Sequence, residues 1–163
     1  MAAPGDAMRR TDLVEAALVL CDTPGGYSDP EVARLMAQRP AGRGAFAPSF
    51  ADREPELAFL YREIQRSTPD RAPGGRPRAA AGPGAAPTDI APVIEHEIPI
   101  LFVVGEEDSI LPPAALEAMH RKLPGSEFAL VPGAGHSVYF ERPEVFNRLV
   151  IEFLRRHTSS GGP

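Results

Sequence analysis

Apolar residues occur along this chain either in short continuous runs or at helical spacing. Three short runs, at residues 17–21, 100–104 and 127–131, are mainly apolar and lack the strict alternation of a half-exposed strand. Continuous runs of this kind are typical of strands in a parallel sheet that helices cover on both sides. The sequence therefore predicts about three parallel strands, each buried on both faces.

The residues between the second and third predicted strands have the spacing of a helix. In segment 112–124, Leu116, Met119 and Leu123 fall on one stripe, and the Pro-Gly pair at 124–125 ends the helix. A strand, a helix and a second strand in this order predict a βαβ unit with a right-handed crossover.

The strongest helical pattern lies near the C-terminus, in segment 142–157. Pro143 is suited to its first turn, and Arg155 and Arg156 are suited to its negative end. We expect this helix to pack on the sheet and residues 158–163 to form a disordered tail. Its broad apolar face consists of Val145, Phe146, Leu149, Val150, Phe153 and Leu154.

The middle of the chain, residues 28–92, has a different character. Segments 28–38 and 53–67 both have helical spacing, and Ser28 or Asp29 is suited to cap the first of these helices. Between residues 69 and 92 lie six of the 19 prolines and four of the 15 glycines, together with a run of alanines. No packed element fits this composition, so we interpret it as a flexible loop.

Composition and charge narrow the class of protein. The chain has 163 residues, of which 43% are hydrophobic and 24% charged, and its net charge of −5 offers no basic surface for nucleic acid. No apolar stretch approaches the ~20 residues of a membrane span. The single cysteine suits a reducing compartment, so we expect a cytoplasmic protein. The four histidines have no metal-ligand spacing, and neither a metal nor a cofactor is expected.

Two loops carry the residues with catalytic potential. Asp108 lies in GEEDSILPP, which follows the second predicted strand, and His136 lies in PGAGHSVYFERPEVFN, which follows the third. Because the carboxyl ends of neighbouring parallel strands meet at one edge of a sheet, we expect these side chains to lie close together. An acid in that position can hold an imidazole in one tautomer and stabilise its protonated form.

This arrangement resembles the last part of the α/β-hydrolase fold, in which the catalytic acid follows one late strand and the catalytic histidine follows the next. The resemblance implies that Asp108 is the acid and His136 the histidine of a catalytic triad. LVLCDTPGG, residues 18–26, is similar to the strand that precedes the inserted cap of that family. The implied fold is a partial α/β-hydrolase fold: an N-terminal segment with the first core strand at 1–27, a helical cap at 28–92, and a βαβα core at 93–157.

Each of these residues also has a simpler interpretation. Asp108 fits an ordinary strand-to-helix turn, and a histidine between glycines is often an exposed loop residue. Gly133 and Gly135 are suited to backbone geometry alone. The aromatic residues of the middle segment fit either a substrate pocket or ordinary helix packing, and the sequence leaves both open; they are Phe46, Phe50, Phe59 and Tyr61.

The chain departs from the family pattern at the nucleophile, because no G-x-S-x-G occurs in it. Ser28 obeys the chain order of the triad, but Pro30 and Glu31 beside it indicate a helix cap, and Cys21 suits the core. The sequence therefore predicts a hydrolase-family chain for esters or related bonds of small apolar molecules, inactive by itself. The alternatives are a minimal hydrolase that uses Ser28 and a non-catalytic binding module. The open apolar edge of the first strand predicts self-association or a complementing N-terminal half.

Overall fold

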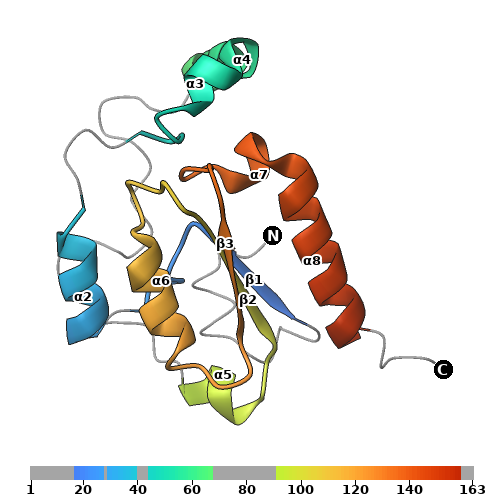
Figure 1. Cartoon of the computed structure of the whole chain (residues 1–163). Coiled ribbons are helices and arrows are strands. Elements are labelled where there is room, and N and C mark those ends of the chain that lie inside the picture. Colours follow the sequence, from blue (N-terminus) through green and yellow to red (C-terminus); the bar gives the residue numbers. More distant parts are fainter. Residues whose placement is uncertain (1–16, 28, 40–43, 68–90, 159–163) are drawn as a thin grey trace.

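The computed structural model describes residues 17–27, 29–39, 44–67 and 91–158, and its centre is a parallel sheet of three strands (Figure 1). The strands β1 (Leu18–Cys21), β2 (Ile100–Gly105) and β3 (Glu127–Val131) lie in the order β1-β2-β3. Leu18 pairs with Ile100, and Leu101 pairs with Glu127. The predicted parallel sheet is confirmed, and its strands end within one residue of the predicted bounds.

Helices cover both faces of this sheet, as the continuous apolar runs require. Helix α6 (Pro113–His120) lies on one face with α2 (Pro30–Ala37) against it, and α8 (Pro143–Thr158) lies on the other, as Figure 1 shows. Each face has its own apolar core. Leu116 and Met119 of α6 are fully buried against Phe102 on the first face, and Phe153 of α8 is fully buried against Val103 on the second.

Burial on both faces holds fully for only one of the three strands. Every residue of β2 is buried, whereas burial alternates along β1, and in β3 Leu130 is 45% exposed. Within the described residues, β1 and β3 are edge strands with one neighbour each, and the helices cover them less completely than they cover the centre. The prediction of full burial was therefore wrong for β1 and β3.

The described part of the middle segment before residue 68 contains three helices. Asp29 caps α2, because its side chain accepts a hydrogen bond from the Val32 amide at 2.8 Å, while Ser28 lies outside the described residues. Lys122, just beyond α6, pairs with Asp29 at 2.6 Å and with Glu31 at 2.7 Å, which ties α2 to the core. The other two helices, α3 (Phe50–Arg53) and α4 (Pro55–Ser67), lie together near the carboxyl ends of the strands (Figure 1).

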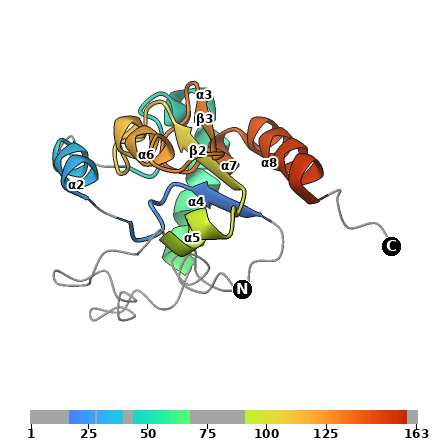
Figure 2. The same cartoon turned by 90° about the horizontal axis from the view of Figure 1, so that it is seen from below.

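Three short helices, of which α3 is one, were not predicted from the sequence. Helix α5 (Ala91–Glu95) covers the last two residues of the stretch interpreted as a loop without packed elements, because Val93 anchors it in the core with 2% exposure. Figure 2, seen from below, shows α5 beside the sheet. Helix α7 (Val138–Glu141) follows the His136 loop directly. Thr158, the first residue of the predicted tail, is the last residue of α8, while residues 159–163 and the rest of the 69–92 stretch lie outside the described residues. No helix in the described part of the chain is long and apolar enough to span a membrane.

Candidate functional site

The carboxylate of Asp108 is fixed by the loop that leaves β2. Its side chain has no exposed surface, and its Oδ1 atom accepts hydrogen bonds from the backbone amides of Ile110 and Leu111, both at 2.8 Å. These two bonds are those of a turn, as the simpler interpretation of this residue proposed. They leave the second oxygen, Oδ2, directed at His136.

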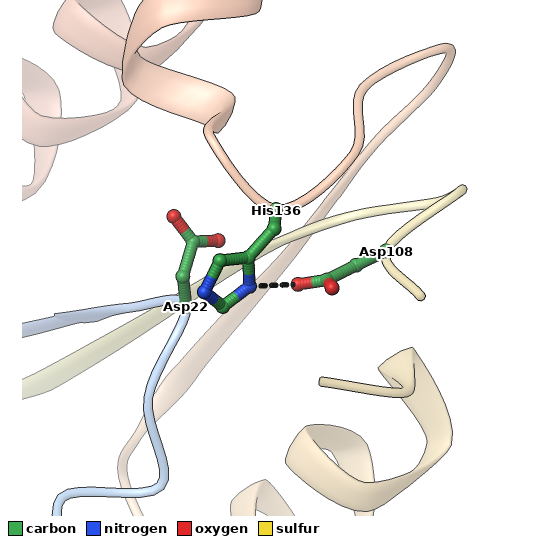
Figure 3. Close-up of side chains that lie close together, drawn as sticks. All are labelled: Asp22, Asp108 and His136. Carbon is green, nitrogen blue, oxygen red and sulfur yellow. Dashed lines mark hydrogen bonds and ion pairs between the residues drawn. The ribbon is translucent and has the colours of Figure 1, made fainter. Parts of the chain in front are cut away.

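His136 lies on the loop that leaves β3, and its ring meets Asp108 at the predicted edge of the sheet. The Nδ1 atom lies 2.9 Å from Asp108 Oδ2, and the imidazole side chain is 25% exposed (Figure 3). The structure thus brings together the two residues that the sequence singled out. A ring with its Nδ1–H donated to Asp108 has a free lone pair on Nε2, where it can accept a proton.

Three carboxylates act on the imidazole. Burial alone lowers the pKa of His136, but the hydrogen bond and the negative charge of Asp108 outweigh it, and Asp22 and Glu141 add to their effect. The net result is a pKa of His136 above its usual value. A protonated imidazole is therefore stabilised here, which is what a general base requires after it has taken a proton.

Asp22, at the end of β1, is a third member of the site that the sequence analysis did not single out. Figure 3 shows the imidazole between Asp22 and Asp108. Burial raises the pKa of Asp22 to about 7, against a hydrogen bond from the Cys21 thiol and the charge of His136. Its φ of 58° lies in the left-handed region, and its Oδ1 atom is buried without a hydrogen-bond partner in the described structure. The signal in the sequence that could have indicated Asp22 is its position directly after the predicted strand at 17–21.

The glycines beside the site serve backbone geometry, as the sequence suggested. A Cβ at Gly135 would lie 2.2 Å from the Ala47 nitrogen, and one at Gly105 would lie 2.2 Å from the Gly135 oxygen. The His136 loop is therefore packed between β2 on one side and the segment before α3 on the other, with no room for a side chain.

A cavity of about 590 Å³ opens beside the imidazole. Tyr61 on α4 faces it from the middle segment, and its hydroxyl lies 3.3 Å from Ser137 Oγ. Of the four aromatic residues left open by the sequence, Tyr61 lines this cavity, Phe46 and Phe50 pack together with it and Phe140, and Phe59 is 63% exposed. The cavity is lined by Cys21, Asp22, Ala45, Tyr61, Gln65, Ile110, His136, Ser137 and Tyr139.

The same cluster has the atoms of a possible cation site, because ligand atoms of Asp22, Asp108 and His136 lie within 4.8 Å of one another. Both oxygens of Asp108, however, already receive N–H donors, and the His136 nitrogen nearest to it is one of them. The oxygens of Asp108 and the Nδ1 atom of His136 are thus already engaged in hydrogen bonds with each other and with two backbone amides. Cys21, the other nucleophile considered, has its thiol pKa raised by burial and by Asp22, which disfavours the thiolate.

Comparison with known proteins places the chain in a family. The sequence model of the α/β hydrolase family matches residues 2–149. The chain belongs to the α/β-hydrolase family. The three-stranded sheet with its flanking helices is accordingly a partial α/β-hydrolase fold, as predicted.

Several of the similar proteins are esterases. A pimeloyl-[acyl-carrier protein] methyl ester esterase of Neisseria meningitidis is 28% identical over 144 residues, which are 82% of this chain and 53% of the relative. The structure of a thermophilic esterase from Thermogutta terrifontis is 27% identical, with a TM-score of 0.55 over 86% of this chain and 56% of that one. Rv0554 from Mycobacterium tuberculosis, at 19% identity and a TM-score of 0.63 over 95% of this chain, shares the fold. The chain spans about half the length of the Neisseria meningitidis esterase.

Proposed function

We propose that this chain carries the acid and the histidine of an ester-hydrolysing site, with His136 as the general base and Asp108 as the residue that orients it. The main support is the 2.9 Å contact between His136 Nδ1 and Asp108 Oδ2, made by a carboxylate whose other oxygen two amides already hold. The esterase relatives at 28% and 27% identity support an ester as the bond that is cleaved.

In the proposed reaction, His136 Nε2 takes the proton of a hydroxyl nucleophile as the oxygen attacks the ester carbonyl. The imidazolium then gives this proton to the leaving alcohol, which leaves an acyl intermediate. Water attacks this intermediate with His136 again as base, and the acid product departs. The carboxylate of Asp108 stabilises the imidazolium, in agreement with the raised pKa of His136.

The proposal assigns no nucleophile within the sequence. The 163 residues contain no G-x-S-x-G, the thiol of Cys21 is held in its neutral form, and Ser28 lies outside the described residues. We therefore propose that these residues alone do not hydrolyse esters, and that the attacking hydroxyl is supplied by a segment that is not among them.

We further propose that the middle segment is the cap of this site. Helix α4 contributes Tyr61 and Gln65 to the cavity wall beside His136, whereas α2 packs against α6 and contributes no residue to it. The substrate-facing part of the proposed cap is thus residues 44–67. The mixture of aromatic, amide and hydroxyl groups suits a small, mainly apolar ester with one polar end.

A panel of p-nitrophenyl esters and methyl esters tests the proposal, with the wild type compared with His136→Ala and Ser28→Ala. We expect no turnover in the wild type beyond that of His136→Ala. Turnover that both substitutions abolish would establish a minimal hydrolase with Ser28 as nucleophile and overturn the proposed inactivity. If the chain shows no turnover and binds a specific partner protein that covers the cavity beside His136, it is instead a binding module.

The role of His136 itself needs a protein that has a nucleophile. If the gene encodes an in-frame G-x-S-x-G upstream, we expect His136→Ala in the longer protein to lower kcat by about 10⁶-fold. An unchanged kcat would refute the role of His136.

The free edge of β1 motivates a final part of the proposal. Within the described residues β1 pairs on one side only, with β2, although Leu18 and Leu20 are buried. We propose that the isolated chain pairs along this edge, with another copy or with a complementing segment. A chain that elutes as a monomer in size-exclusion chromatography and unfolds cooperatively in a thermal melt would contradict this. The proposed location remains the cytoplasm, on the basis of the cysteine content.

A further inference from the structure

Glu141 is a buried charged residue near the site that the proposed reaction does not use. Glu141 is the last residue of α7 and is only 6% exposed. Its Oε1 atom accepts hydrogen bonds from the amides of Gly135 at 2.9 Å and Ser137 at 3.3 Å. These are the amides on either side of His136, so one carboxylate oxygen holds the backbone that carries the imidazole.

The second oxygen of the same carboxylate faces a distant part of the chain. Glu141 Oε2 accepts a hydrogen bond from the amide of Ala47 at 2.9 Å, in the segment that leads into α3. The contact is buried and joins residues 94 positions apart. Glu141 therefore links the His136 loop to the part of the middle segment that borders the cavity.

From these contacts we propose that Glu141 is the positioning residue of the site: it fixes the His136 loop so that Nδ1 meets Asp108, and it locks that loop to segment 44–67. This inference rests on the proposed role of His136. It adds that the orientation of the base and the seating of the proposed cap depend on the same carboxylate.

The packing around Glu141 supports a tight mechanical link. A Cβ at Gly135 would lie 2.2 Å from the Ala47 nitrogen, so the two segments joined by Glu141 already touch through their backbones. Phe140, the preceding residue, stacks on Phe46 with ring centroids 5.9 Å apart. A small movement of one segment must therefore displace the other.

Only a carboxylate satisfies both sides of this link. Gly135 and Ser137 present N–H donors to one oxygen, and Ala47 presents an N–H donor to the other. Glutamine has the same shape but offers one acceptor and one donor, so one of the two sides would meet a second donor. Aspartate keeps two acceptors and the charge, but its side chain is one methylene shorter and cannot span both sides.

The test is the NMR signature of the His136 ring in the full chain, measured in Glu141→Gln and Glu141→Asp. The Nδ1–H proton that His136 shares with Asp108 is expected at low field in the wild type. We expect this signal to be lost and the pKa of His136 to fall in both variants. Glu144→Gln removes an exposed carboxylate three residues further on and is expected to leave both readouts unchanged.

Three results would overturn the inference. If both variants lose thermal stability while the ring signal and the pKa of His136 stay as in the wild type, Glu141 is merely structural. If the ring signal and the pKa of His136 keep their wild-type values in Glu141→Asp but not in Glu141→Gln, the negative charge at position 141 determines them and the hydrogen bonds to both segments do not. If Glu144→Gln has the same effect as Glu141→Gln, the position has no special role. None of these readouts requires ester turnover, so failure of the inference is distinguishable from failure of the proposed function.

Discussion

Replacement of Asp108 by asparagine isolates the effect of one oxygen atom on the imidazole. The carbonyl oxygen of Asn at 108 can keep both amide donors, Ile110 and Leu111, which now bond to Oδ1. The amide nitrogen then takes the place of Oδ2, 2.9 Å from His136 Nδ1. Two donors would meet there unless the ring moves its proton to Nε2. In that tautomer Nε2 has no lone pair for a proton, so the proposed base is disabled.

The expected magnitude follows from the charge that is removed. A carboxylate at hydrogen-bonding distance shifts the pKa of its partner by about 1–3 pKa units, and each unit corresponds to about 1.4 kcal/mol. Burial alone lowers the pKa of His136, and Asp108 is the main group that opposes it. We therefore expect the pKa of His136 to fall below its ordinary value of about 6.5 in Asp108→Asn.

The stability of the variant should depend on pH in a defined direction. A histidine whose pKa is raised by folding stabilises the protein below its unfolded pKa, and this contribution disappears as the pH rises through the folded pKa. The free energy of unfolding lost in Asp108→Asn is thus expected to be larger at pH ~6 than at pH ~8. At the higher pH the ring is neutral, and the loss is limited to the exchange of its hydrogen bond to the charged Asp108 carboxylate, worth about 1.5–3 kcal/mol, for one with the Asn amide.

The measurement is a pH titration of the histidine Cε1–H signals, with His136 assigned by its absence in His136→Ala. Glu107→Gln removes a negative charge from the same loop, and Glu107 is not among the carboxylates that act on the His136 ring, so this variant serves as the control. A pKa of His136 that is equal in wild type and Asp108→Asn, or a stability loss that is independent of pH, would refute the reasoning.

Two further substitutions test the surroundings of the pair. In Asp22→Asn we expect the free energy of unfolding to rise by about 1–3 kcal/mol at pH ~8 and by less at pH ~5, because burial raises the pKa of Asp22 to about 7. The cost of ionising Asp22 in the folded protein then grows as the pH rises from the ordinary pKa of an aspartate to about 7, and it is complete above that pH. Denaturant unfolding at the two pH values measures this, and equal changes would contradict it. In Gly135→Ala we expect a loss of about 3 kcal/mol or more, since the new Cβ would lie 2.2 Å from the Ala47 nitrogen. Gly44→Ala, whose Cβ meets nothing closer than 3.8 Å, is the matched control, and equal melting temperatures of the two variants would show that the loops are not packed as described.

Much of the fold follows from local patterns. The apolar runs and the helical stripe with Leu116 and Met119 were sufficient to predict the βαβ unit, because period and turn residues are properties of neighbouring positions. The pairing of Asp108 with His136 could be predicted for a related reason. Both follow parallel strands that are adjacent in the sheet, and the carboxyl ends of such strands share an edge.

Other features depended on contacts between distant positions. Leu130 pairs with Val104 and lies on the same face of the sheet as α6, and its exposure depends on how far α6 covers the edge strand, which no period in the strand encodes. Helix α5 is held by the burial of Val93 and carries no strong helical signal of its own. Glu141 had the appearance of a residue before a helix start, and nothing in the sequence indicated that its carboxylate receives the amide of Ala47.

By itself, the sequence determined the order of strands and helices and the edge at which an acid and a histidine meet. The tertiary structure alone decided which other groups surround that pair: Asp22 on the far side of the ring, Glu141 behind the loop, and Tyr61 across the cavity. The physical reason is that hydrogen bonds and burial depend on distances in space. Segments far apart in the chain reach those distances only when two apolar cores have packed on the two faces of the sheet.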